Sequence, residues 1–107
     1  MKDAIGTLWT RIQKRIGASP DSSYTAQLLA SGAPRIAKKL GEEAIELALA
    51  GALGDREGTI RESADLVYHW LVLLAAMGLD PAAVFAELER RQGQSGLEEK
   101  RARDPGT

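Results

Sequence analysis

The 107-residue sequence contains no cysteine, which excludes disulfides, thiolate metal sites and a catalytic thiol. Histidine occurs once, and any metal site must use oxygen or nitrogen ligands. Neither sign of charge dominates, because 14 lysines and arginines are balanced by 15 aspartates and glutamates. This balance predicts no nucleic-acid partner.

Long hydrophobic runs are also absent from the sequence. The longest one, residues 70–77, is far too short to cross a bilayer, and Gly6, Thr7 and Arg11 interrupt any signal-peptide core near the N-terminus. We therefore expect a cytoplasmic protein with no membrane partner. The length suits one domain with a small core, to which a second subunit would add buried surface.

Apolar residues spaced three and four apart predict helices along most of the chain. The expected helices are residues 4–16, a short helix within residues 24–32, two long helices over 34–53 and 56–77, and a last helix opened by Asp80 and Pro81. Because no strand-like alternation is evident, we predict an all-α fold, a helical bundle of four to five helices completed by dimerisation. Residues 1–92 should form a single domain, and residues 93–107 a charged, glycine-containing mobile tail.

Carboxylates recur at helical spacing in both long predicted helices. The pairs are Glu43 with Glu46 and Glu62 with Asp65, and Glu42 is a further acid beside the first pair. Like charges at this spacing repel and destabilise a helix, so something positive should offset them. Carboxylate oxygens suit hard cations, which makes magnesium or manganese the candidate partner.

Solvated or salt-bridged surface acids are the alternative to a metal site, and Lys39 is placed to pair with them. Two observations favour the metal. Glu43 lies at the edge of the apolar stripe of its helix, and Glu62 and Asp65 lie on a strip of the next helix, which is apolar almost all round from Ala64 onward. Burying such carboxylates is costly without a partner. Since a short turn joins the two helices, we expect antiparallel neighbours whose acids converge on one divalent-metal site.

Magnesium is normally held by carboxylates, water and substrate phosphates together, so the pattern predicts a phosphorylated ligand. Lys38 and Lys39, with Arg35, could meet phosphate oxygens or form a solvated basic face. Tyr24 could stack on a base or sugar, or belong to the core. His69, one turn after the second acid pair, could hydrogen-bond within that pair, contact substrate or be an ordinary core residue.

No glycine-rich phosphate loop, nucleophile elbow or zinc-protease motif occurs, and no residue stands out as a covalent nucleophile. The remaining chemistry is attack of a metal-bound water on a phosphoanhydride, with the cations neutralising phosphate charge. Spacing leaves the general base open. Glu43 is the first candidate, because it lies nearest to the apolar stripe of its helix.

Several segments combine into a pattern that is more specific than the acid pairs alone. They read SYTAQLL from Ser23, IAKKLGEEAIE from Ile36, GDR from Gly54, ESADLVYH from Glu62 and LVLL from Leu71. In this order they resemble the phosphoribosyl-ATP pyrophosphatase family, which performs the second step of histidine biosynthesis.

The resemblance implies an all-α nucleotide pyrophosphatase that cleaves phosphoribosyl-ATP to phosphoribosyl-AMP and pyrophosphate as a magnesium-dependent homodimer. The family's Glu-x-x-Glu and Glu-x-x-Asp motifs would supply the catalytic and metal-binding residues. On this sequence these acids are Glu43, Glu46, Glu62 and Asp65, with Glu42 additional. From the residues themselves we expect Lys38, Lys39 and Tyr24 to contact substrate. Two rivals remain: a house-cleaning nucleoside triphosphate pyrophosphatase of the same superfamily, and a noncatalytic helical dimerisation module.

Overall fold

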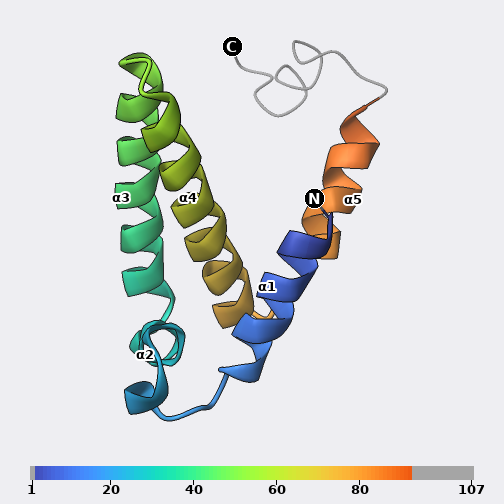
Figure 1. Cartoon of the computed structure of the whole chain (residues 1–107). Helices are drawn as coiled ribbons and strands as arrows, with labels where there is room; N and C mark the ends of the chain where they lie inside the picture. The colour runs from blue at the N-terminus through green and yellow to red at the C-terminus, as the bar shows by residue number, and fades with distance from the viewer. Residues whose placement is uncertain (1, 93–107) are drawn as a thin grey trace, which may run out of the picture.

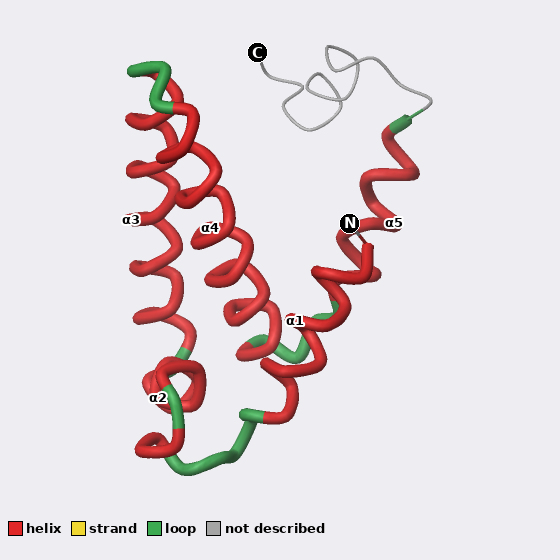
Figure 2. The backbone as a smooth tube through the Cα atoms, in the orientation of Figure 1, coloured by secondary structure: helices red, strands yellow, loops and turns green. Residues whose placement is uncertain are grey.

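The structure is a computed structural model that describes residues 2–92, and within this range it contains helices and no strand (Figure 2). The all-α prediction is therefore confirmed, and each predicted helix is present with ends shifted by no more than two residues. The predicted tail, residues 93–107, lies outside the described residues. In chain order the elements are α1 (Lys2–Lys14), the short 3-10 helix η1 (Pro20–Ser22), α2 (Tyr24–Ser31), α3 (Ala33–Ala52), α4 (Arg56–Ala76) and α5 (Pro81–Arg91).

Side-chain caps explain where three of these helices begin. Ser23 caps α2, Asp55 caps α4 and Asp80 caps α5, each by accepting a hydrogen bond of 2.8–3.0 Å from a backbone N–H of the first turn. A cap of this kind is worth about 1 kcal/mol. Between α3 and α4, Gly54 has a φ of +72°, a value that favours glycine and lets one helix end and the next reverse direction within a few residues.

The helices are arranged around an antiparallel α3–α4 hairpin (Figure 1). α2 packs across one end of this hairpin and contacts both of its helices, and α1 packs against α4. α5 turns away from α4 by 111° and lies beside α1, with which it lines an apolar groove (Figure 1). No single helix of residues 2–92 is long and apolar enough to cross a membrane; α4 and α5 pass that test only as a bent pair.

The core lies at the end of the hairpin that α1 and α2 cover. Trp9 and Trp70 pack against it as partly buried residues. The helices α1, α2, α3 and α4 each contribute at least one fully buried side chain: Ile12, Leu28, Ile36, Leu71 and Val72.

The opposite end of the hairpin leaves large apolar side chains uncovered. Leu49 is 59% exposed, Leu53 83% and Ile60 71%, and Ile45 is exposed on the same part of α3. We call these four residues the hairpin surface. The prediction that the second long helix is buried nearly all round from Ala64 onward is wrong where that stretch begins, because Ala64 and Asp65 are exposed and the buried positions beyond Gly58 are confined to residues 69–75.

Candidate active site

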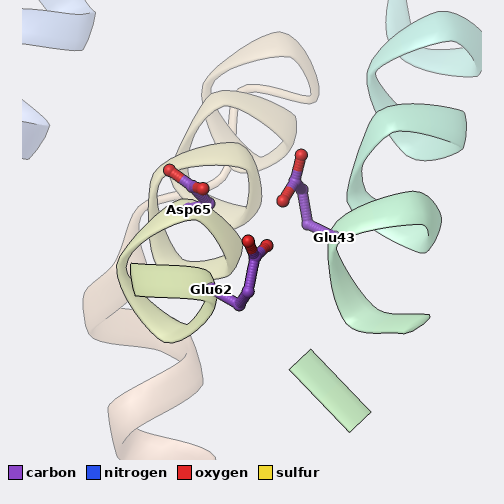
Figure 3. A group of neighbouring side chains, drawn as sticks. All are labelled: Glu43, Glu62 and Asp65. Carbon is purple, nitrogen blue, oxygen red and sulfur yellow. The ribbon is translucent and has the colours of Figure 1, made fainter. Parts of the chain in front are cut away.

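Three carboxylates from α3 and α4 converge between the two helices (Figure 3). Glu43 extends from α3, while Glu62 and Asp65 lie one turn apart on α4. One oxygen of each carboxylate lies within 4.8 Å of one oxygen of the others. The hairpin explains the meeting: Glu43 precedes Gly54 by as many residues as Asp65 follows it, so antiparallel helices bring the two to the same level.

Two oxygen atoms of this acid cluster are buried without a hydrogen-bond partner among the described residues. These are the Oε2 atoms of Glu43 and Glu62, which are inaccessible to solvent. An unsatisfied buried polar atom costs about 1–3 kcal/mol, and more when it is charged. Three like charges at these distances also repel one another. A hard divalent cation would relieve both costs, so the oxygen-only donor set fits magnesium or manganese.

The third member of the acid cluster, Asp65, is exposed, whereas we expected it to be buried. The physical reason is the position of the core: the fully buried positions of α4 beyond Gly58 begin at His69, and the preceding turn reaches the core only through the partly buried Val67 and Tyr68. Glu43 and Glu62 are each half-buried. The cluster is therefore open to solvent on the Asp65 side, where a phosphorylated ligand would have access.

Two further predicted acids lie outside the acid cluster. Glu46 and Glu42 are both exposed on α3. Glu42 Oε1 lies 3.7 Å from the Nζ atom of Lys39, and both side chains are well exposed to solvent. Such a surface ion pair is worth about 0–1 kcal/mol. The salt-bridge alternative thus applies to Glu42, whereas the three clustered acids form no ion pair within residues 2–92.

The predicted substrate-contacting residues flank the acid cluster. Lys38 is exposed and Lys39 is half-buried on α3, within a turn or so before Glu43. Tyr24 lies at the start of α2 and its side chain is 51% exposed. Its ring stacks on Tyr68 of α4, with centroids 6.4 Å apart and an interplanar angle of 21°.

A hydrogen bond that the sequence did not suggest ties α2 to α4 beside this stack. The hydroxyls of Thr25 and Tyr68 lie 2.5 Å apart. Burial raises the pKa of Tyr68, with the hydrogen bond to Thr25 acting in the opposite direction, so its phenol is neutral near pH 7. Both residues lie in the segments that carry the family resemblance, but no spacing rule relates positions 43 residues apart.

His69 adjoins the same aromatic group and is only 6% exposed. Its ring lies edge-on to Tyr68, at a centroid distance of 5.0 Å, and to Tyr24 at 6.4 Å. Its Nδ1 atom lies 2.8 Å from the main-chain oxygen of Asp65, which is one of the contacts the sequence allowed. Its Nε2 atom is buried and has no partner among the described residues.

Comparison with known proteins identifies the family to which this chain belongs. The family model described as phosphoribosyl-ATP pyrophosphohydrolase matches residues 6–92, which is nearly all of the described chain. The chain belongs to the phosphoribosyl-ATP pyrophosphohydrolase family. The match takes in most of α1, for which the motifs of the sequence had offered no role.

Individual relatives in the phosphoribosyl-ATP pyrophosphohydrolase family support the same assignment, and each is named phosphoribosyl-ATP pyrophosphatase. The protein from Parvibaculum lavamentivorans is 60% identical over 96 residues, which cover 90% of this chain and 88% of the relative. The protein from Rhizorhabdus wittichii is 50% identical over 106 residues, covering 99% and 100%. The Agrobacterium fabrum protein is 55% identical over 92 residues, or 86% of each chain. The resemblance drawn from the sequence segments is thereby confirmed.

Proposed function

We propose that this protein hydrolyses phosphoribosyl-ATP to phosphoribosyl-AMP and pyrophosphate, the second step of histidine biosynthesis. The observation that carries the proposal is the acid cluster of Glu43, Glu62 and Asp65, with its two unpartnered buried oxygens, in a chain of the phosphoribosyl-ATP pyrophosphohydrolase family. The relatives named for this activity match nearly the whole chain.

Glu43, Glu62 and Asp65 are proposed to hold magnesium, with manganese as a substitute, and Glu46 and Glu42 to act as further acids of the site. Magnesium would neutralise phosphate charge and make a water molecule a better nucleophile. Glu43 is the first candidate to accept the proton of the attacking water, because it lies beside the buried part of the site. The new P–O bond forms as the α–β phosphoanhydride bond breaks, and pyrophosphate leaves.

Lys38 and Lys39 are proposed to bind phosphate oxygens, and Tyr24 to contact the nucleoside. The ion pair of Lys39 with Glu42 does not oppose this role, because an exposed pair at 3.7 Å is weak. A lysine–phosphate contact is a charge-assisted hydrogen bond and is stronger. The half-exposed ring of Tyr24 offers a flat apolar surface close to the acid-bearing helix.

We further propose that residues 1–92 form one domain that acts as a homodimer in the cytoplasm. The radius of gyration is 16.1 Å, whereas a compact domain of this length has about 12–13 Å. The chain alone is thus open, and its hairpin surface of Ile45, Leu49, Leu53 and Ile60 is uncovered. A second copy that packs on the hairpin surface would bury these side chains, each worth roughly 1.5–3 kcal/mol when fully covered.

The direct test compares pyrophosphate release from phosphoribosyl-ATP with release from ordinary and damaged nucleoside triphosphates. We expect turnover of phosphoribosyl-ATP in magnesium and near-total loss in the Glu43→Gln, Asp65→Asn double variant, with helical circular dichroism retained. Faster turnover of other triphosphates would favour the house-cleaning pyrophosphatase. An active double variant would contradict the proposed site, and an inactive wild type would favour the noncatalytic dimerisation module.

A further inference from the structure

The Nε2 atom of His69 is a buried polar group that the hydrolysis described above does not use. The residue is only 6% exposed and the atom has no hydrogen-bond partner among the described residues. Leaving such a group unsatisfied destabilises a fold, so native proteins usually provide a partner from protein, water or ligand. The partner of Nε2 is therefore to be sought beyond the described residues.

The contact at the other ring nitrogen determines what kind of partner fits. Nδ1 lies 2.8 Å from the main-chain oxygen of Asp65, and a carbonyl oxygen can only accept a hydrogen bond. Nδ1 must therefore carry the proton. In the neutral imidazole the remaining nitrogen, Nε2, is then an acceptor, and its partner must be a donor such as a hydroxyl.

Position along α4 indicates which donor of a nucleotide is close enough. Glu62, Asp65 and His69 follow one another at helical spacing on one strip of α4, and four residues of helix span about 6 Å. Phosphates held at the acid cluster would place the adjoining sugar about one helical turn away. Phosphate oxygens are acceptors, so the sugar hydroxyls are the nearest donors.

Two aromatic rings lie edge-on beside His69, those of Tyr68 and of the more exposed Tyr24. The Tyr24 ring has its centroid 6.4 Å from that of His69 and belongs to a half-exposed side chain at the start of α2. Exposed side chains change rotamer within picoseconds to nanoseconds, so the ring can move aside when a ligand enters. Tyr24 would then rest against the bound nucleoside while His69 meets its sugar.

We propose that His69 Nε2 accepts a hydrogen bond from a ribose hydroxyl of the nucleotide substrate and makes the enzyme select ribonucleotides over deoxyribonucleotides. This inference rests on the proposed hydrolysis of phosphoribosyl-ATP. It makes His69 a substrate-contacting, specificity-determining residue whose ring orientation is set by the main chain of Asp65.

The test measures kcat/KM for phosphoribosyl-ATP and for analogues that lack the 2′- or the 3′-hydroxyl of the ATP ribose. We expect the wild type to prefer the ribonucleotide over at least one analogue by roughly 10- to 100-fold, the usual consequence of leaving a buried acceptor unpaired. Equal values for all three substrates would overturn the inference while leaving the proposed function intact. Failure to hydrolyse phosphoribosyl-ATP would remove the proposed function and this inference with it.

Two variants separate a sugar contact from a structural role of His69. His69→Asn keeps a donor near the position of Nδ1 but has no atom near Nε2, whereas His69→Gln offers an amide oxygen near Nε2. We expect the asparagine variant to lose the preference for the ribonucleotide and the glutamine variant to retain part of it. Magnesium affinity, measured by calorimetry, should be unchanged in both, because Asp65 keeps its place. An asparagine variant with the wild-type preference would show that Nε2 is satisfied by a buried water instead.

Discussion

Replacing Glu62 by glutamine should make the protein more stable without magnesium and should remove most of the stabilisation that magnesium gives. The change keeps the shape of the side chain but removes one charge from the acid cluster. Glu62 takes part in two of the three carboxylate pairs there, and each pair has oxygens within 4.8 Å. The variant therefore loses most of the repulsion that the folded apo-protein must bear.

The size of the effect follows from the same distance. Two unit charges 4.8 Å apart repel by about 0.9 kcal/mol in bulk water and by about 3.5 kcal/mol at an effective dielectric constant of 20. Because Asp65 is exposed and Glu62 half-buried, the lower part of this range applies. We expect Glu62→Gln to gain about 1–3 kcal/mol in free energy of unfolding, or roughly 5–15 °C in Tm.

Thermal unfolding at one fixed protein concentration, in EDTA and in excess magnesium, measures both parts of this prediction. A cation at 100 times its dissociation constant stabilises the wild type by about 2.7 kcal/mol, and the variant should lack most of that shift. Glu89→Gln on α5 is the matched control, because it removes the same charge outside the acid cluster. A lower Tm for Glu62→Gln in EDTA, or equal responses of wild type and variant to magnesium, would refute the reasoning.

Three further predictions follow from packing. Tyr68→Phe removes the hydroxyl hydrogen bond to α2 and should lower the free energy of unfolding in urea by about 0.5–1.5 kcal/mol. Burial raises the pKa of Tyr68 above 10.0, so the stability that its neutral phenol contributes is present below pH 10 and lost as pH rises through the raised pKa. The variant should lack this alkaline loss of stability. Gly58→Ala would place a Cβ atom against the carboxylate of Asp55 and break the cap of α4, which should lower the free energy of unfolding by about 1–2 kcal/mol. Gly6→Ala is the control, because its Cβ meets no atom within 4 Å, and it should leave the Tm unchanged or raise it. Leu49→Glu on the hairpin surface should give a monomer in sedimentation analysis, and an unchanged mass would place the subunit contact elsewhere.

The helices could be predicted from the sequence because their signals are local. Ser23, Asp55 and Asp80 cap helices where a polar residue precedes an apolar-periodic segment, and the structure shows all three bonds. The meeting of Glu43 with the acids of α4 was also foreseeable, because a short turn fixes the register of two antiparallel helices. The spacing of residues within each helix and the short turn between two helices were sufficient to predict the helix starts and the acid cluster.

What the sequence could not supply depends on contacts between distant segments. The bond between Thr25 and Tyr68 joins positions 43 residues apart, and no periodicity marks it. The exposure of Asp65 was missed because the helix was taken to be buried nearly all round from Ala64 onward, whereas its buried positions beyond Gly58 begin only at His69. The hairpin surface could not be predicted either, because the exposure of its apolar side chains depends on how the helices are arranged.

Calorimetric titration of magnesium into the metal-free protein, with and without a nonhydrolysable analogue of phosphoribosyl-ATP, tests the central claim most directly. If Glu43, Glu62 and Asp65 hold a cation that also binds substrate phosphates, the analogue should tighten magnesium binding at least about 10-fold, and magnesium should tighten analogue binding by the same factor. Glu43→Gln should lose both effects. Magnesium binding that is indifferent to the analogue, or equal in wild type and Glu43→Gln, would contradict the account.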